Sequence, residues 1–480
     1  MNLDHAQKSY LTRRQFCRFT AVTTGVLAAG GLTLWEAQVG NAAPLDRGRE
    51  NIQVSHDEGS FAAHAETGLA ANPRLPRNLL GISIVASNKG ALTLATYASF
   101  NGGSTWKSNG ELPMPVGISD ADDPSVAFDG AGHGFVCGSL RGDPWDTMIA
   151  VWRSDDGGAS FAAPVAAMQG ETVDRPYLAV DRSAGPSSGN LYVVWAAQSL
   201  TQVGLARSTN GGLSFEPTRL ITKSEDIVVA GATPAVGKDG LVAVIYAAEK
   251  LSAGGNDPDS GEEGVNDDGP PSPGPAPRRP ETMGEVRVLC STDYGQTFSQ
   301  PVVLGTGAIE LLFPDGAAGS PALPTIAVDH HRNIIYAVFV THESRASHSA
   351  IVLSASSDYG RTWGTTRAIT PASETIIYFQ PQVAVDEAGR VAISAFTFDT
   401  QTNLANVVLI ISRPHNLSFL PPITVTSQPF DPARGALSGG SKHGPWWLGD
   451  YLGLASTPDA FHPLWADTRL GHLELFTATV

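Results

Sequence analysis

The octet SSDYGRTW, residues 356–363, is one of five near-copies of the same short polar turn in this chain. All five follow the rule Ser-x-Asp/Asn-x-Gly-x-Ser/Thr-Trp/Phe. A pattern that recurs this regularly predicts a repeated structural unit. The other copies are SFNGGSTW from Ser99, SDDGGASF from Ser154, STNGGLSF from Ser208 and STDYGQTF from Ser291.

Each fixed position of the octet has a physical role in a tight turn. The Asp or Asn side chain can bond to nearby backbone N–H groups, and Gly can take the positive φ that other residues resist. The closing Trp or Phe is expected to begin the next strand and to bury a large apolar face. We therefore interpret the octets as hairpin turns with a structural role.

The spacing of the octets shows the size of the repeated unit. Successive initial serines lie 55, 54, 83 and 65 residues apart, so a unit of about 55 residues recurs with an insertion in the fourth unit. A sixth, degenerate copy, SRPHNLSF, begins 56 residues after the fifth, at Ser412. Each unit opens with a short apolar run, such as PSVAFD at Pro124, and contains three further runs. Four strands per unit predict an all-β propeller of four-stranded antiparallel blades.

The octets resemble the Asp boxes, or BNR repeats, of sialidases and related propeller proteins, and the resemblance spans roughly residues 60–480. Typical sialidases have six blades. Here a seventh unit supplies three runs, GDYLGLAS, HPLWAD and ELFTATV, and NIQVS at Asn51 is available as a fourth. Joining strands from both ends of the chain would remove an exposed sheet edge. We therefore favour seven blades, with six as the alternative.

Residues 1–42 have the layout of an export signal. Arg13, Arg14 and Phe16 resemble the motif of the twin-arginine pathway, and an apolar run then leads to small residues near Ala42. The run is shorter and richer in Gly and Thr than a membrane-spanning helix requires. We expect export to the periplasm or the extracellular space, which would leave residues 43–480 as the propeller domain.

Composition limits the partners of the exported chain. Residues 1–42 contain four basic and two acidic residues, so their removal would change the formal charge from −16 to −18. Such a surface repels nucleic acid and anionic membranes. The resemblance to sialidases implies a glycan or glycoconjugate as the partner, and we expect a monomer. Cys137 and Cys290 fall in blades that are not neighbours, so we expect two buried thiols.

The segment of residues 252–282 is rich in Asp, Glu, Pro and Gly. Its acidic side chains are oxygen ligands of the kind that Ca²⁺ takes. Its Pro and Gly density favours a solvated loop instead. The sequence otherwise indicates neither a metal nor a cofactor.

Blade topology predicts where a functional site lies. In a four-stranded blade, the octet turn and the turn between the first two strands share one face, so the blade connections and the loops between strands two and three share the other. The resemblance to sialidases implies that the second face carries the active site. The candidate catalytic residues there are Asp450, Tyr451, Asp123, Asp174, Glu343 and Asp467, and the candidate substrate-binding residues are Arg141, Arg175, Arg469, Trp145 and Trp447.

The resemblance also implies roles. Arg141, Arg175 and Arg469 would clamp a sugar carboxylate, Asp123 would be the acid/base, and Tyr451 with Glu343 would form the nucleophile pair. The Phe/Tyr-Arg-Ile-Pro motif of the family is missing, and the nearest stretch, NPRLPRNLL at Asn72, fits better as the turn after the first inner strand. The assignment of a sialidase therefore depends on the site alone.

Two other functions stay open. A different glycosidase would use paired carboxylates, Asp123 or Asp174 with Asp450 or Asp467, without an arginine clamp. Carboxyl groups about 5 Å apart suit a retaining enzyme, and a separation of roughly 6.5–9.5 Å suits an inverting one. A non-catalytic propeller that binds a glycan or a protein would keep the aromatic residues without such a pair. The sequence slightly favours a glycoside hydrolase.

Overall fold

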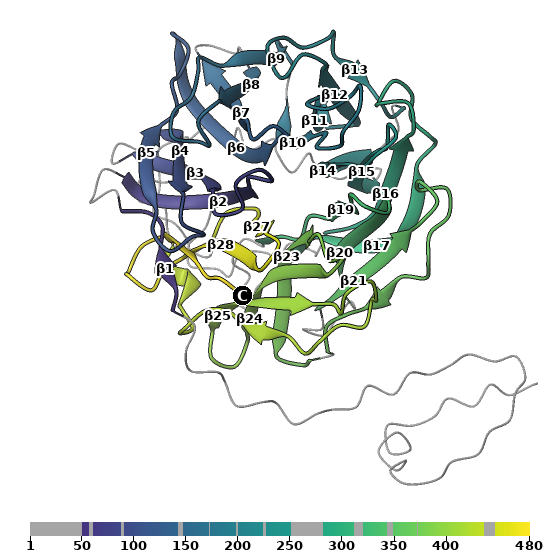
Figure 1. Cartoon of the computed structure of the whole chain (residues 1–480). Coiled ribbons are helices and arrows are strands. Elements are labelled where there is room, and N and C mark those ends of the chain that lie inside the picture. The colour runs from purple at the N-terminus through teal and green to yellow at the C-terminus, as the bar shows by residue number, and fades with distance from the viewer. Residues whose placement is uncertain are drawn as a thin grey trace, which may run out of the picture. The chain divides into compact units, whose positions relative to one another are not determined.

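Each repeated unit of the sequence forms one antiparallel sheet, and seven such sheets are arranged as blades around a central axis (Figure 1). Six blades have four strands, and the fourth blade has a short fifth strand. The seven-bladed propeller is therefore confirmed, and the six-bladed alternative is wrong. The computed structural model describes residues 50–56, 61–87, 91–142, 147–171, 173–197, 200–223, 227–250, 282–311, 320–342, 349–371, 373–435 and 447–480.

The blades follow one another in chain order, and the first strand of each blade lies nearest the axis. Blade 1 contains β2 (Phe61–Ala71), β3 (Leu79–Ser87), β4 (Leu92–Ser99) and β5 (Lys107–Glu111); blade 2 contains β6 (Ile118–Phe128), β7 (Gly134–Gly142), β8 (Thr147–Ser154) and β9 (Val165–Gln169); blade 3 contains β10 (Asp174–Val180), β11 (Leu191–Ala197), β12 (Gln202–Ser208) and β13 (Arg219–Leu220).

The second half of the ring repeats this arrangement. Blade 4 contains β14 (Ile227–Val236), β15 (Val242–Lys250), β16 (Thr282–Ser291), β17 (Val302–Leu311) and β18 (Ser320–Pro321); blade 5 contains β19 (Thr325–Asp329), β20 (Ile334–His342), β21 (Ser349–Ser356) and β22 (Arg367–Ala368); blade 6 contains β23 (Ile376–Val385), β24 (Val391–Asp399), β25 (Leu404–Ile411) and β26 (Ile423–Thr424); blade 7 contains β27 (Gly453–Ser456), β28 (Phe461–Asp467), β29 (Glu474–Thr477) and β1 (Ile52–Gln53). A single 3₁₀ turn, Pro432–Arg434, precedes blade 7 in the described residues.

Blade 7 closes the ring with strands from both ends of the propeller. The short strand β1 pairs with β29, with Ile52 opposite Thr477. The Val54 N–H extends this pairing by donating to the Leu475 carbonyl at 2.8 Å. The predicted closure by the segment at Asn51 is thus confirmed.

The octets lie at the turns between the third and fourth strands, where they were predicted. In the octet that begins at Ser356, the Gly360 N–H donates to the Ser356 hydroxyl at 2.9 Å. The Thr362 N–H and hydroxyl donate to the Asp358 carboxylate at 2.9 and 2.6 Å. Equivalent bonds from the backbone hold the other four octets. The octet is therefore a turn built on its own side chains.

The closing aromatic residues of the octets differ from expectation in one respect. They are half-buried and pack at the rim of the apolar clusters, because the octets project from the ends of the sheets: Trp106, Phe161, Phe215, Phe298 and Trp363. The core itself lies between neighbouring blades and contains the fully buried Trp152, Trp195 and Trp465. Cys137 and Cys290 are buried free thiols in this core. Among the described residues, no helix has the length and apolar character needed to cross a membrane.

The octet carboxylates predict a dependence of stability on pH. Hydrogen bonds from the Thr362 side chain and N–H lower the pKa of Asp358 to about 2. Burial opposes the shift at Asp293, but the bonds from Thr297 and Ser291 lower the pKa of Asp293 to about 2 as well. A depressed pKa in the folded state gives stability that is present above the ordinary value of 3.8 and lost as the pH falls through about 2.

The double variant Asp293→Asn/Asp358→Asn should lose less stability than the wild type on acidification from about pH 5 to pH 2. Asn can accept the same backbone bonds, as Asn101 and Asn210 do in two other octets. Urea unfolding at the two pH values measures the difference. An equal loss in the variant and the wild type would contradict this account of the octets.

Candidate functional site

The innermost strands share an irregularity near the end that lies opposite the octets. Five of them contain a register shift at which one residue takes a positive φ. A bulge of this kind bends the strand and re-aims the side chain. The residues with positive φ at the shifts are Glu66 (51°), Asp123 (52°), Arg175 (49°), Gly231 (61°) and Gln380 (48°).

Four of these five residues are not glycine, and three of them precede a proline. A left-handed conformation costs a non-glycine residue on the order of 1–3 kcal/mol, and strain of this kind gathers at functional sites. Backbone strain thus identifies the end of the inner strands opposite the octets as the candidate functional site.

The Arg175 guanidinium is the centre of the side-chain network at this end. It donates from Nη2 to Asp450 Oδ2 at 2.6 Å and from Nε to the same oxygen at 3.0 Å. It also donates from Nη1 to Asp174 Oδ2 at 2.8 Å. The Arg175 backbone N–H reaches Asp123 Oδ2 at 3.2 Å. One residue therefore connects three carboxylates from blades 2, 3 and 7.

A second connection lies within blade 2. The Ser139 hydroxyl donates to Asp122 and lies 3.3 Å from Asp123 Oδ2. The Arg141 guanidinium forms an ion pair with Asp122 at 2.5 Å. Asp122 and Asp123 thus share one hydroxyl donor, and Arg141 is already neutralised by a protein carboxylate.

Tyr451 and Glu66 meet across the junction of blades 7 and 1. The Tyr451 hydroxyl donates to Glu66 Oε2 at 3.4 Å. The Tyr177 ring from blade 3 packs against the Tyr451 ring with centroids 5.2 Å apart. Glu66 is 3% exposed and Tyr451 is 8% exposed, so this pair is withdrawn from bulk water.

The segment that leads into β27 holds Asp450 in place. The Trp447 indole N–H donates to Asp450 Oδ1 at 2.9 Å. The Gln380 side-chain amide donates to the Gly449 carbonyl. Gly449 has φ 97°, and a Cβ at this position would lie 2.4 Å from the Glu66 N. Only glycine fits between Glu66 and Asp450, so the contact of blades 7 and 1 depends on it.

Burial and repulsion between like charges dominate the electrostatics. We call Glu66, Asp122, Asp123, Asp174 and Asp450 the carboxylate cluster. Burial, followed by the charges of Asp450 and Asp123, raises the pKa of Glu66 well above its ordinary value. Burial, Asp122 and Asp174 raise the pKa of Asp123 well above its ordinary value. Groups with such perturbed proton affinity are typical of catalytic sites.

The tyrosines and the arginine respond to the same environment. Burial and the charge of Glu66 raise the pKa of both Tyr177 and Tyr451 well above the ordinary value. Burial by itself would lower the pKa of Arg175, but Asp174, Asp450 and Asp123 raise it well above the ordinary value. Arg175 therefore stays charged at every working pH.

Six of the residues predicted from the sequence are brought together here: Asp123, Asp174, Arg175, Trp447, Asp450 and Tyr451. Arg141 joins them through Asp122. Glu343 and Trp145 lie outside the described residues, as do residues 252–281 of the acidic segment that was considered for calcium. The described residues contain no group of His, Cys, Asp and Glu arranged to hold a metal ion.

Asp467 and Arg469 are placed elsewhere, in the closure of the ring. Asp467 is fully buried and accepts bonds from Trp465 Nε1 at 2.9 Å and from the Arg469 guanidinium at 2.6 Å. Arg469 lies over the Phe476 ring at 4.1 Å and donates to Asn51 Oδ1 at 2.9 Å. In the part of the chain that the structure describes, neither residue bonds to the carboxylate cluster.

Glu66 and Tyr177 belong to the site but were not predicted. The sequence contains a signal for Glu66, because each residue with positive φ at a bulge lies six positions before the first residue of the following turn. The first turn residues of the seven blades are Asn72, Asp129, Asp181, Gly237, Asp329, Asp386 and Thr457. The residues six positions before them are, in the same order, Glu66, Asp123, Arg175, Gly231, Leu323, Gln380 and Tyr451. The sequence predicts the turn at Asn72, and the same count from that turn leads to Glu66.

Comparison with known proteins places the fold. No family model and no curated protein matches the chain. Among solved structures, an ulvan lyase of polysaccharide lyase family PL25 is similar at a TM-score of 0.51 and 13% identity, over 90% of this chain and 96% of that chain. This likeness shows the propeller fold and leaves the reaction to be judged from the site.

Two further solved structures are similar at lower scores. The α-L-arabinofuranosidase Arb93A from Fusarium graminearum has a TM-score of 0.46 at 14% identity, over 72% of this chain and 92% of that chain. A Hadza microbial sialidase has a TM-score of 0.45 at 14% identity, over 82% of this chain and 74% of that chain.

The close approach at Gly449 gives a prediction with a matched control. Gly471→Ala should cost about 1–2 kcal/mol of unfolding free energy, because Gly471 has a positive φ but no atom within 4 Å of the added Cβ. Gly449→Ala should cost about 1–3 kcal/mol more, since its Cβ would also overlap the backbone of Glu66. Urea unfolding measures both variants. Equal costs would show that blades 1 and 7 can separate at this point.

The raised pKa of Asp123 gives a second prediction. A raised pKa in the folded state means that stability falls as the pH rises from the ordinary value of 3.8 toward the folded value. Asp123→Asn cannot ionise and can still accept the Arg175 N–H, so its stability relative to the wild type should increase from about pH 4 to pH 7. Calorimetric melting at the two pH values measures this change. A relative loss at neutral pH would contradict the buried-charge account.

Proposed function

We propose that this propeller is a glycan-acting enzyme, specifically a glycoside hydrolase that uses the carboxylate cluster and Tyr451. The observation that carries the proposal is the pair of buried carboxyl groups, Glu66 and Asp123, whose pKa values are raised beside ion-paired carboxylates. Glycosidic cleavage needs one carboxyl group that can give a proton and another group that attacks or activates water.

The environment suggests a division of roles. Asp123 has the raised pKa that a general acid needs to protonate the leaving oxygen near neutral pH. Tyr451 would be the nucleophile, and Glu66, to which its hydroxyl donates, would accept the proton. Glu66 thus takes the part that the resemblance to sialidases gave to Glu343. Asp174 and Asp450 would fix Arg175 and the shape of the site.

The charge of the cluster favours a neutral glycan over an anionic one. The described residues supply five carboxyl groups and only two guanidinium groups, Arg141 and Arg175, and both guanidinium groups are ion-paired within the protein. A sugar carboxylate would have to displace those partners and approach like charges. The third arginine of the expected clamp, Arg469, is bonded in the ring closure. A glycosidase for uncharged sugars is therefore preferred to a sialidase.

The fold is compatible with this proposal, since the ulvan lyase that shares it is also named for action on a glycan. An export signal in residues 1–42 would bring the enzyme to glycans outside the cytoplasm. A glycan-binding propeller without catalysis is the alternative, and the assay below separates the two.

The test compares turnover with folding. Release of reducing ends is measured on a panel of neutral, uronate and sialate glycosides. Asp123→Asn and Tyr451→Phe should each lower kcat/KM by at least about 10²-fold on the active glycoside, because each removes a positioned proton donor or nucleophile. The matched control is Asp129→Asn, a buried Asp on the same blade at the octet end, which accepts backbone bonds from Ala131 and His133.

Asp129→Asn should change thermal stability and leave turnover per folded molecule unchanged. Full activity in Asp123→Asn and Tyr451→Phe would reject this site. Binding without release of any product would favour the glycan-binding alternative. Unsaturated rather than hydrolysed ends would assign the site to a lyase, and activity confined to sialates would overturn the preference for neutral sugars.

A further inference from the structure

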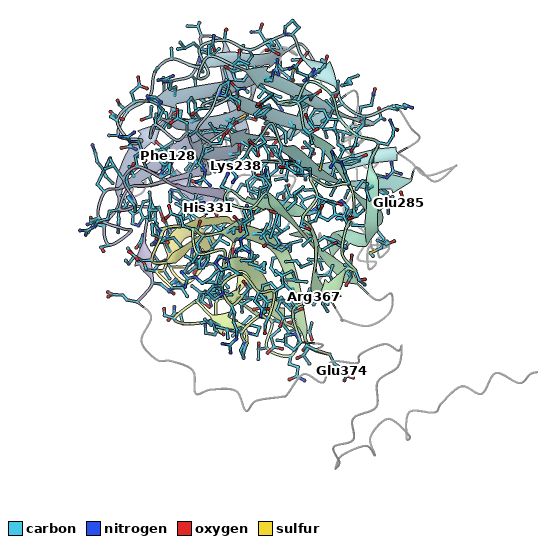
Figure 2. The ribbon with its side chains drawn as sticks, turned by 45° about the vertical axis from the view of Figure 1, so that its right-hand side comes forward. Phe128, Lys238, Glu285, His331, Arg367 and Glu374 are labelled. Atoms are coloured by element: carbon cyan, nitrogen blue, oxygen red, sulfur yellow. The ribbon has the colours of Figure 1, made fainter. Side chains whose placement is uncertain are left out.

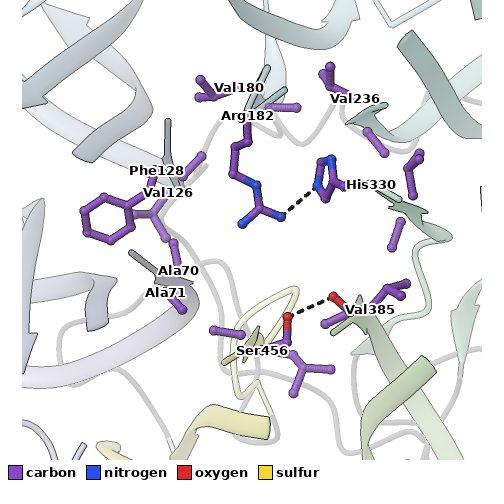
Figure 3. A pocket seen from close by; sticks show the side chains of 18 of the residues that line it. Ala70, Ala71, Val126, Phe128, Val180, Arg182, Val236, His330, Val385 and Ser456 are labelled. Carbon is purple, nitrogen blue, oxygen red and sulfur yellow. Dashed lines mark hydrogen bonds between the residues drawn. The ribbon is translucent and has the colours of Figure 1, made fainter. Parts of the chain in front are cut away.

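A cavity lies at the octet end of the inner strands, opposite the carboxylate cluster. It follows the central axis, has a volume of about 210 Å³ and is lined by residues from the innermost strand of all seven blades. Figure 3 shows its side chains, with Val126 and Phe128 from blade 2, Val180 from blade 3 and Val236 from blade 4 around the opening.

A small residue at one position of every repeat leaves this space open. One equivalent position of all seven innermost strands is alanine, and all seven alanines line the cavity: Ala70, Ala127, Ala179, Ala235, Ala327, Ala384 and Ala455. Each innermost strand is also the end strand of its sheet, so one edge with its backbone N–H and C=O groups is directed to the axis. The walls therefore combine short side chains with groups that can hydrogen-bond to a ligand.

The turn residues three positions after these alanines follow the lining of the cavity, and two of them, Arg182 and His330, line its mouth. In four consecutive blades the residue there is charged or titratable: Arg182, Lys238, His330 and Glu387. Arg182 Nη2 and His330 Nε2 lie 2.7 Å apart and meet over the opening, as the dashed line in Figure 3 shows. Lys238 Nζ donates to the His331 carbonyl at 2.6 Å, and Figure 2 labels both residues.

Arg182 differs from the arginines of the first site. Arg141 and Arg175 are each ion-paired with a carboxylate of the cluster. Within the described residues, no carboxylate lies within ion-pair distance of Arg182, whose bonded partner is His330. Burial, followed by the charges of Arg182 and His331, lowers the pKa of His330 well below its ordinary value, so His330 is neutral and accepts the guanidinium N–H. The charge of Glu387, at the same mouth, acts on Arg182 without forming an ion pair with it. The mouth thus presents a guanidinium that is not ion-paired with any described carboxylate, in a chain of formal charge −16.

We propose that this cavity binds a small hydroxylated carboxylate, such as a hydroxy acid or a sugar acid. The carboxylate would bond to Arg182 and His330 at the mouth, and the hydroxyl groups would bond to the strand edges inside. A cavity of 150 Å³ accommodates benzene, so 210 Å³ suits a ligand of about eight to ten non-hydrogen atoms. This site is distinct from the carboxylate cluster and does not depend on the proposed function.

The chemistry separates this class of ligand from others. A neutral sugar would leave the Arg182 guanidinium without an anion, and an aliphatic acid without hydroxyl groups would leave the strand edges without hydrogen-bond partners. Hydrogen bonds that involve charged groups are about twice as strong as neutral ones, so Arg182 should dominate affinity.

The experiment is isothermal titration of the full-length protein with D-erythronate, erythritol and hexanoate, which all lie within or close to this size range. D-erythronate should bind, and erythritol and hexanoate should bind at least about tenfold more weakly. Arg182→Gln should weaken D-erythronate binding by about 10- to 100-fold, the loss expected for a charge-assisted hydrogen bond. Arg182 is exposed at the mouth, so the variant should fold normally.

The matched control is Arg153→Gln, an arginine on the octet side that is ion-paired with Asp155 at 2.7 Å and does not line the cavity. It should bind D-erythronate as the wild type does. The proposal is overturned if D-erythronate gives no binding, if erythritol binds equally well, or if Arg182→Gln keeps the wild-type affinity. A loss of D-erythronate binding in Asp123→Asn but not in Arg182→Gln would place the ligand in the carboxylate cluster and overturn it as well.

Discussion

The closure of the ring by antiparallel pairing of β1 with β29 is the constraint on which the rest of the molecule depends. It places blade 1 beside blade 7, so that Tyr451 reaches Glu66 although 385 residues separate them in the chain. Thr67 extends this junction, because its hydroxyl donates to the Leu464 carbonyl at 2.7 Å and accepts the Gly453 N–H at 3.0 Å. The candidate nucleophile and its base are therefore neighbours only in a closed ring.

The candidate site lowers the stability of the folded ring. Four non-glycine residues keep a left-handed backbone there, and five carboxyl groups lie near only two arginines. Each of these features costs free energy, and the apolar clusters between neighbouring blades offset that cost. The two ends of the inner strands differ accordingly, since the octet end carries self-satisfied turns and the opposite end carries strained and mutually repelling groups.

The fold was predictable because the octet has a local cause. An Asp or Asn that bonds to its own turn and a glycine with positive φ act within eight residues, so single-sequence reasoning reaches them. Part of the site followed from the same logic, since the repeat predicts Asp123, Arg175 and Asp450 at equivalent places near the start of inner strands of different blades. The structure places Asp123 inside β6. Glu66 was not predicted because it lies inside β2, whereas the predicted residues were those expected at the ends of strands. Asp467 and Arg469 were grouped with the site because topology gives the end of a strand but not the direction in which a side chain bonds.

The bulge on the inner strands has a consequence for how such a protein can change over evolution. Its position is fixed by the distance to the next turn, whereas the residue that occupies it varies among Glu, Asp, Arg, Gly and Gln. The scaffold therefore tolerates different chemical groups at a set of equivalent points that converge on one axis. A new combination of acid, base and cation needs only point substitutions at these places, without any insertion or rearranged strand. Each of the five bulged blades therefore contributes one exchangeable side chain to the same end of the axis.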